Sequence, residues 1–308
     1  MKKMLFVFNP TAGKGMIKTH LSEILDIFAK SDYDITVRPT QAPLDAYNYI
    51  SIYGNNYDRV VVSGGDGTLN EAVKGMLTFD ESNRRPIGYI PSGTTNDFAS
   101  TLQIPKNMIE AAHIASKGMP FKCDSGKFND KTFNYVAAFG AFTDIPYDTS
   151  QDIKNNLGQM AYVLEGIKRL SQLTSYKVKI KHDNGETTQN VFLCMVLNST
   201  SVAGIHSAGK LIGANLSDGL FEMLLFRKPA NLIDFNAVIM GLVSGKTSGE
   251  NYSIIKSSHF EFESEEKIKW TLDGEYGGDP SHSVIDVLPS AITYIVDGEK
   301  LISRLLTQ

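Results

Sequence analysis

A glycine-rich segment at residues 63–71 has the residue types of a phosphate-binding turn. It reads Ser-Gly-Gly-Asp-Gly-Thr-Leu-Asn-Glu, follows a short apolar run and precedes a helical pattern over Leu69–Leu77. Glycines let a ligand approach the backbone closely, and the N–H groups at a helix start attract phosphate. Thr68 and Glu71 have capping-box spacing, which predicts that the helix begins at Leu69. The alternative is a strand-to-helix turn that binds nothing.

Three other loops in the first half carry similar residues, and each follows an expected strand. They are Asn9-Pro10-Thr11-Ala12-Gly13-Lys14-Gly15, Pro39-Thr40 and Pro91-Ser92-Gly93-Thr94-Thr95-Asn96-Asp97. In an open parallel sheet, ligands bind outside the carboxyl ends of the strands. Four loops with glycines, hydroxyls and a lysine at one sheet edge therefore predict a nucleotide site.

Two pairs of carboxylates could take part in phosphoryl transfer. Asp66 and Asp97 would repel phosphate unless Mg²⁺, Lys14 or a water lies between them, and their alternative function is helix or turn capping. A pair of Asp side chains facing a triphosphate across a metal ion is one arrangement for phosphoryl transfer. Asp273 and Glu275 stand on a turn after an expected strand, where a carboxylate suits a general base. Their alternative is an exposed hairpin turn.

Other motifs carry weaker signals. The segment Asn215–Leu220 is either a plain turn or a small site for a hard cation, built from one carboxylate and backbone carbonyls. The segment Gly241–Thr247 resembles a Walker A loop but is one residue short between its glycines, so we interpret it as a helix C-terminus. The six histidines show no metal-ligand spacing, and the two cysteines are far apart in the sequence.

The pattern of expected strands and helices that must position these residues changes near residue 120. The first part alternates strands and helices, which predicts a Rossmann-like parallel sheet with helices on both faces. The expected strands are Met4–Phe8, Asp34–Arg38, Arg59–Val62 and Ile87–Ile90, and the expected helices are Met16–Lys30, Leu44–Tyr53, Leu69–Leu77 and one from about Asn96.

The second part reads as a β-sandwich or barrel with two inserted helices, Ile153–Leu173 and Leu232–Val243. Turn signals stand at Asn184-Gly185 and Asp297-Gly298. The expected strands are Phe133–Phe139, Lys177–Lys181, Val191–Leu197, Leu220–Phe226, Phe260–Phe262, Ile268–Leu272 and Val284–Leu288. We expect domains at 1–122 and 123–291, and residues 292–308 either complete the first domain or close the second.

Composition limits the classes of function. The chain has 308 residues, of which 42% are hydrophobic and 21% charged, enough for about two ordinary domains. A net charge of −4 gives no reason to expect nucleic-acid binding. The longest apolar run, Val191–Leu197, is too short to span a membrane. We expect a cytoplasmic protein that touches the inner face of a membrane at most peripherally. The oligomeric state stays open, a homodimer included.

Taken together, these residues resemble the soluble bacterial diacylglycerol kinase family, which is related to sphingosine kinases and more distantly to NAD kinases. The matching motifs occur in family order over nearly the whole chain. The Gly-Gly-Asp-Gly element is shared with NAD kinases, whereas the Pro-Ser-Gly-Thr-Thr-Asn-Asp run and the late Asp-Gly-Glu favour the lipid kinases. The motifs are Asn9-Pro10 with Gly13 and Gly15, Gly64–Thr68 with Asn70-Glu71, Pro91–Ala99, Asp218-Gly219 and Asp273–Glu275.

The resemblance implies a diacylglycerol kinase-like fold and transfer of the ATP γ-phosphate to a lipid hydroxyl, most simply diacylglycerol to phosphatidic acid, in the cleft between the domains. It implies that Glu275, supported by Asp273, takes the hydroxyl proton from a lipid presented at a membrane surface. The implied ATP contacts are Asn9, Pro10, Thr11, Ala12, Gly13, Lys14, Thr40, Gly65, Asp66, Gly67, Thr68, Leu69, Asn70, Glu71 and Thr94.

The resemblance further implies a structural Mg²⁺ held by Asp218 with groups of Asn215 and Leu220. Asp66, Asp97 and Asp124 would form an acidic network around metal and phosphate, although little around Asp124 is distinctive.

This sequence departs from the family pattern at two positions. Ala12 replaces a commonly hydroxylated residue, which removes one phosphate contact, and Ser217 stands where a second Asp is frequent, which weakens the implied cation site. Two rival functions stay open: an NAD kinase, and a non-catalytic regulator that senses nucleotide.

Overall fold

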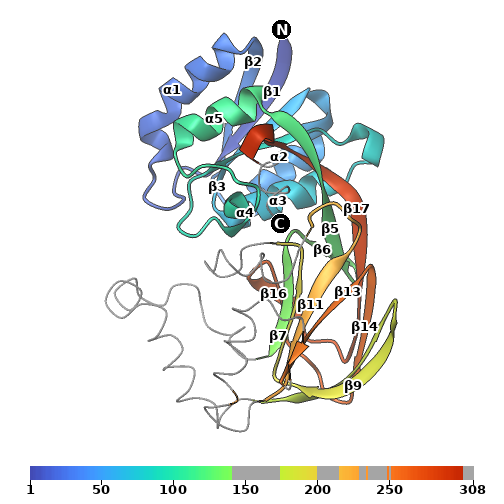
Figure 1. Cartoon of the computed structure of the whole chain (residues 1–308). Coiled ribbons are helices and arrows are strands. Elements are labelled where there is room, and N and C mark those ends of the chain that lie inside the picture. The colour runs from blue at the N-terminus through green and yellow to red at the C-terminus, as the bar shows by residue number, and fades with distance from the viewer. Residues whose placement is uncertain (141–173, 200–214, 229–233, 235–247, 250, 301–308) are drawn as a thin grey trace.

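The computed structural model describes residues 1–140, 174–199, 215–228, 234, 248–249 and 251–300 (Figure 1). The helix expected at Ile153–Leu173, nearly all of the helix expected at Leu232–Val243 and the segment Gly241–Thr247 lie outside these residues. None of the helices in the described part of the chain could span a bilayer, because none combines the required length with an apolar composition.

The first part of the chain forms a parallel sheet covered by helices. Its strands run in the order β2-β1-β3-β4, and α1 packs beside α5 while α2 packs beside α3. The strands are β1 (Lys2–Phe8), β2 (Tyr33–Pro39), β3 (Arg59–Gly64) and β4 (Ile87–Pro91). The helices are α1 (Ile17–Lys30), α2 (Asp45–Tyr53), α3 (Asp66–Leu77), α4 (Asp97–Thr101) and α5 (Met108–Lys117), with short 3₁₀ turns at Gly54–Asn56 and Glu81–Asn83.

The inner strands are apolar because helices cover both faces of the sheet. Every residue of β4 is buried, as are Val60, Val61 and Val62 of β3. Parallel strands that are buried on both faces carry such continuous apolar runs. The carboxyl ends of β1, β2, β3 and β4 therefore meet at one edge, where the polar loops of the sequence emerge.

The second part is an antiparallel sandwich. One sheet has the order β12-β13-β11-β10-β7-β15-β16. Its strands are β7 (Val136–Gly140), β10 (Leu193–Leu197), β11 (Phe221–Phe226), β12 (Ser248–Gly249), β13 (Tyr252–Ser257), β15 (Trp270–Leu272) and β16 (Glu275–Gly278). The facing strands are β5 (Met119–Phe128), β6 (Lys131–Phe133), β8 (Tyr176–His182), β9 (Gly185–Val191), β14 (His259–Ser264) and β17 (His282–Val296).

An aromatic cluster fills the space between the two sheets. The ring of Trp270 lies 4.7 Å from Phe139, 5.0 Å from Phe262 and 4.9 Å from Phe128, measured between centroids. Edge-to-face and tilted rings at these distances contribute beyond the burial of their area. The fold class expected from the sequence, a Rossmann-like parallel sheet followed by a β-sandwich, is confirmed.

One long strand joins the two parts. β17 pairs in parallel with β4 through Tyr294 and Ile295, and antiparallel with β14 and β5. Figure 1 shows β5 and β17 running side by side between the α/β part and the sandwich. Because β5 itself runs through residue 122, the boundaries 1–122 and 123–291 stay a prediction, as does the assignment of 292–308.

Several expected elements differ in detail. Phe133–Phe139 divides into β6 and β7, and Val191–Leu197 spans the end of β9 and all of β10. The sequence pattern did not predict strands β5 and β13. The Asn184-Gly185 hairpin is confirmed by the pairing of β8 with β9. Asp297-Gly298 is not a hairpin turn, since helical backbone begins at Gly298.

Candidate active site

Three of the polar loops touch through their glycines. A Cβ on Gly13 would collide with the carbonyl oxygen of Ser92, and one on Gly93 would lie 2.5 Å from Gly65 Cα. The Ser92 N–H donates to the Gly64 carbonyl at 2.9 Å, and the Asn9 N–H donates to the Ser63 carbonyl at 2.8 Å. The loops after β1, β3 and β4 therefore form one continuous glycine-lined surface. Larger residues at these glycines would push the loops apart.

The buried side chains beneath this surface hold the loops together. Tyr89 donates its hydroxyl to the Gly64 carbonyl at 3.1 Å and lies 3.3 Å from Asn96 Oδ1. Asn96 also accepts from the Gly93 N–H and donates to the Gly93 carbonyl, at 3.0 and 2.7 Å. Tyr89 was not assigned a site function from the sequence, because its partner Gly64 belongs to a different loop.

In the first loop, Asn9 and Thr11 contact each other. Asn9 Oδ1 accepts from the Thr11 N–H at 2.9 Å and from the Thr11 hydroxyl at 2.8 Å, so this amide shapes the loop. Lys14 is exposed at the loop tip, and Thr94 is exposed on the β4 loop. Thr40, at the end of β2, is buried, and its N–H donates to the Phe8 carbonyl at 2.9 Å.

The predicted capping box is wrong. α3 begins at Asp66, three residues earlier than expected, and its N-cap is Gly65, which has no side chain to bond the N–H groups of the first turn. Those N–H groups carry the positive end of the helix dipole and suit phosphate. Thr68 lies buried beneath Gly64.

Glu71 points toward a different helix. Its carboxylate accepts from the N–H of Leu44 at 2.9 Å and of Ala46 at 3.2 Å, at the start of α2. Glu71 therefore fixes α2 against α3. A cap supplied by another helix could not be read from the spacing along the chain.

Asp66 also caps a neighbouring helix. Its carboxylate accepts from the N–H of Asp97 at 3.1 Å and of Phe98 at 3.2 Å, at the start of α4. Burial raises the pKa of Asp66, and these two N–H bonds oppose that rise. Asp97 is itself buried. The structure thus brings Asp66 and Asp97 together beside the glycine loops.

Asp124 organises the segment Asn215–Leu220. Its carboxylate accepts from the Gly219 N–H at 2.8 Å and from the Ser290 N–H at 2.7 Å, and burial raises its pKa. Within the segment, Asp218 Oδ1 accepts from the Leu220 N–H at 3.1 Å, and Asn215 Oδ1 accepts from the Ser217 N–H at 3.2 Å.

The donor set of this segment fits a hard cation, because it consists of one exposed carboxylate, an amide oxygen and backbone carbonyls. The same hydrogen bonds would also shape a plain turn. The metal assignment of Asn215, Asp218 and Leu220 stays a prediction.

The turn between β15 and β16 carries the two late carboxylates. Asp273 is buried, has a φ of +52°, and accepts from the N–H groups of Asn134, Tyr135 and Val136 at 2.6, 2.9 and 3.0 Å. These bonds take the N–H groups between β6 and β7, which explains why the expected strand divides there. Burial raises the pKa of Asp273 to about 6, while the three N–H groups and Lys74 oppose the rise.

Glu275 is half exposed and faces α3. Its Oε2 lies 3.4 Å from Lys74 Nζ. On the same face of α3, the amide of Asn70 can donate to Asp273 Oδ2 at 3.3 Å and accept from Lys74 Nζ at 3.2 Å, with the amide oriented to suit both partners. The helix that starts at the glycine loops therefore also contacts Asp273 and Glu275.

Lys74 is the site residue that sequence reasoning missed. The available signal was its i,i+4 spacing from Asn70, which places both side chains on one face of α3. Nothing along the chain indicated that a turn two hundred residues later would pack against that face.

A cavity of about 400 Å³ adjoins Glu275, between α3 and the turns β5–β6 and β15–β16. Lys131 crosses its far side, where its ammonium donates to the Gly277 carbonyl at 2.9 Å and lies 6.0 Å from the centre of the Tyr276 ring. The lining residues are Tyr47, Lys74, Leu77, Thr78, Asp130, Lys131, Thr132, Leu272, Glu275 and Tyr276.

Gly93→Ala is expected to raise the KM for ATP about tenfold or more, since misplaced contacts are costly to a preorganised site. The new Cβ would lie 2.5 Å from Gly65 Cα and 2.9 Å from Asn96 Oδ1, so the two loops must separate. Gly67→Ala should disturb the packing of these loops less, because a Cβ there meets no protein atom within 4 Å. Steady-state kinetics at varied ATP test this, and equal KM values for Gly93→Ala and wild type would contradict it.

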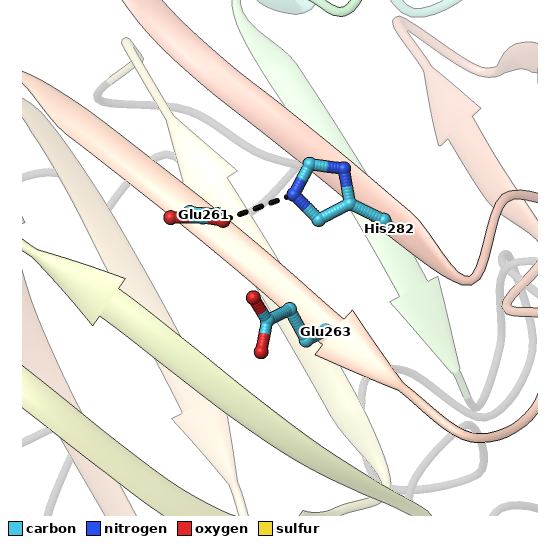
Figure 2. Close-up of side chains that lie close together, drawn as sticks. All are labelled: Glu261, Glu263 and His282. Carbon is cyan, nitrogen blue, oxygen red and sulfur yellow. Dashed lines mark hydrogen bonds and ion pairs between the residues drawn. The ribbon is translucent and has the colours of Figure 1, made fainter.

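A cluster of potential metal ligands also lies on the neighbouring strands β14 and β17 of the sandwich (Figure 2). Glu261 and Glu263 stand on β14, and a ring nitrogen of His282 on β17 points at Glu261 at 3.0 Å. Lys181 already contacts both carboxylates, at 3.0 and 3.2 Å. His282 and Lys181 lower the pKa of Glu261 to about 2. We interpret the cluster as an exposed network of ion pairs.

Comparisons with known proteins agree with this geometry. The family model for the diacylglycerol kinase catalytic domain matches residues 3–128. The chain is 33% identical to the diacylglycerol kinase of Bacillus subtilis (strain 168), over 90% of this chain and 91% of that protein. It is 35% identical to the diacylglycerol kinase of Staphylococcus carnosus (strain TM300), over 90% of each.

A crystal structure of a diacylglycerol kinase from Bacillus anthracis str. Sterne has the same fold. The TM-score is 0.79 at 26% identity, with 97% of this chain and 98% of that chain covered. Similarity of this extent includes both the glycine loops and the turn that carries Asp273 and Glu275. The chain therefore belongs to the diacylglycerol kinase family of lipid kinases.

Proposed function

We propose that the protein transfers the γ-phosphate of ATP to the hydroxyl group of diacylglycerol presented at a membrane surface, with Glu275 as the general base. The observation that carries this proposal is the contact between α3 and the β15–β16 turn. The N-terminus of α3 lies in the glycine-lined surface, and its Lys74 lies 3.4 Å from Glu275. One helix thus links a phosphate-binding backbone to a carboxylate beside a cavity.

The glycine-lined surface fits a triphosphate. Its glycines let the three loops contact each other through their backbones, and the first-turn N–H groups of α3 have no side-chain cap. Preorganised N–H groups of this kind stabilise developing negative charge without rearranging. We propose that Gly65–Leu69 and the loop Asn9–Gly13 hold the phosphates, with Lys14 and Thr94 at the rim. Asn70 and Glu71 support the surface from beneath, through Asp273 and α2.

Asp66 and Asp97 would hold the Mg²⁺ that accompanies ATP, because the two residues are in contact beside the glycine loops. When bound, this cation offsets phosphate charge. Without the cation, Asp66 stabilises α4 by accepting from the N–H groups of Asp97 and Phe98. Asp218, Asn215 and Leu220 would hold a second, structural Mg²⁺, which Asp124 supports by fixing Gly219.

Glu275 suits proton abstraction because it is half exposed at a cavity wall, where an acceptor hydroxyl can reach it. Asp273 acts beneath it. By accepting from three backbone N–H groups, Asp273 holds the turn that projects Glu275 toward α3. Proton abstraction at this carboxylate increases the nucleophilicity of the lipid oxygen.

A panel of acceptors tests the proposal. ATP consumption and product formation would be measured with no acceptor, and with diacylglycerol, a sphingoid base, a polyprenol or NAD. We expect turnover to depend on diacylglycerol in mixed micelles. Phosphorylation of NAD alone would replace the proposal with an NAD kinase, and nucleotide binding without turnover on any acceptor would favour a regulator.

A further inference from the structure

We propose that Lys74 is a positioning residue for the proposed general base: it holds the Glu275 carboxylate against α3 and is linked to Asp273 through the Asn70 amide. This inference rests on the function proposed above for Glu275. It adds a residue that neither the sequence motifs nor the comparisons single out.

The geometry places the Lys74 ammonium group beside two oxygen acceptors, one on Glu275 and one on Asn70. Lys74 Nζ lies 3.4 Å from Glu275 Oε2 and 3.2 Å from the amide oxygen of Asn70. The same Asn70 amide donates to Asp273 Oδ2 at 3.3 Å. Lys74 thus contacts Glu275 directly and reaches Asp273 through one amide. An ammonium group has three donors, so it can satisfy both oxygens at once.

Lys74 is also one of the groups that favour the charged form of Asp273. Asp273 is buried, and burial opposes its charged form, whereas Lys74 favours the charged form. The other charged or titratable groups around the cavity are Lys131 and Asp130 from the β5–β6 turn, Tyr276 from β16 and Tyr47 from α2. Lys131 is directed at the Gly277 carbonyl, so Lys74 is the cation that contacts Glu275 among the described residues of this cavity.

Position along α3 gives the contact its functional meaning. Lys74 lies two turns beyond Asp66, at which the helix begins beside the glycine loops. A shift of α3 relative to the sandwich would move the phosphate-binding N–H groups away from Glu275. The Lys74–Glu275 contact opposes such a shift, since it joins the α/β part to the β15–β16 turn.

The test is the variant Lys74→Met. We expect kcat to fall roughly tenfold while the KM for ATP stays within about twofold, since the loops that hold the nucleotide are untouched. Removal of the cation favours protonated carboxyls. The acidic limb of kcat/KM against pH should therefore move upward by roughly half a unit from the wild-type limb.

Two further variants separate positioning from simple packing. Lys74→Arg keeps the charge and should return the acidic limb to its wild-type position, even if the longer side chain lowers kcat. Lys30→Met removes one lysine from an exposed pair with Asp26 on α1 and should change neither kcat nor the limb. Thermal melting checks that each variant is folded, and Lys74→Gln replaces Lys74→Met if the latter unfolds.

The outcomes distinguish this inference from the proposed function. An unmoved limb in folded Lys74→Met or Lys74→Gln, together with inactive Glu275→Gln, would overturn the positioning function and leave Glu275 as the base. Full activity of Glu275→Gln would overturn both. A limb that moves upward with Lys74→Met and returns with Lys74→Arg would support the inference, because a purely structural lysine would not move it.

Discussion

Glu275→Gln is expected to lower kcat by about 10²–10⁴-fold, which is the usual contribution of one general base. The amide has nearly the shape of the carboxylate but cannot accept the hydroxyl proton. The side chain is half exposed and forms a long ion pair of 3.4 Å with Lys74, so its replacement should leave the fold intact. The rate of diacylglycerol-dependent ATP turnover gives kcat, and a thermal melt of the same sample checks that the variant is folded.

A matched control is available elsewhere in the sandwich. Glu186 on β9 is another exposed glutamate paired with a lysine, Lys179, at 3.0 Å, and it does not line the cavity. Glu186→Gln should keep wild-type kcat. If Glu275→Gln kept more than half of the wild-type kcat, the proton would have to go to a different acceptor, and the assignment of the base would be wrong.

Asp273→Ala is expected to lower the free energy of unfolding by about 2–4 kcal/mol and to abolish most activity, since it leaves several buried donors unpaired. The N–H groups of Asn134, Tyr135 and Val136 would lose their acceptor. The φ of +52° adds to the cost, because Asp tolerates the left-handed region better than Ala does. Urea denaturation and steady-state kinetics measure the two effects.

Asp273→Asn serves as the partner variant. It keeps a carbonyl oxygen and tolerates the same backbone conformation, so its loss of stability should lie between those of wild type and Asp273→Ala. If Asp273→Ala kept both the stability and the kcat of the wild type, the turn would form and function without the carboxylate.

The ionisation of Asp273 also makes stability depend on pH. Burial raises the pKa of Asp273 from its ordinary value of 3.8 to about 6 in the folded protein, so the folded state binds the proton more tightly than the unfolded state. The contribution of this proton to the free energy of unfolding is therefore complete below the unfolded pKa. It declines as the pH rises through the folded pKa. The stability gap between wild type and Asp273→Ala should accordingly narrow between about pH 4 and pH 6.

Much of the fold followed from local pattern. Each strand of the parallel sheet appears within about two residues of its expected range, because buried apolar runs between polar loops have few alternatives. Elements whose pattern depends on partners were missed. β5 alternates weakly, and its pairing with β17 defines it, while Asp273 divides the strand expected at Phe133–Phe139 by taking its N–H groups.

The sequence by itself determined the chemical groups of the site and their order. Glycine loops at strand ends, paired carboxylates and the late Asp-Gly-Glu turn indicate phosphoryl transfer through residue type and spacing, and these survive any choice of domain packing. The same information could not assign partners. Glu71 caps α2 and Asp66 caps α4, although local spacing favoured their own helix.

Only the tertiary structure decided that Lys74 and Asn70 face Asp273 and Glu275. A helix face is a local property, but what packs on it depends on the path of the whole chain. Here β17 and β5 join the sandwich to the parallel sheet and bring a turn near residue 274 against α3. Contacts between residues two hundred positions apart are selected by packing of the complete core. The motifs could therefore indicate Glu275 as a candidate base, but not the lysine beside it.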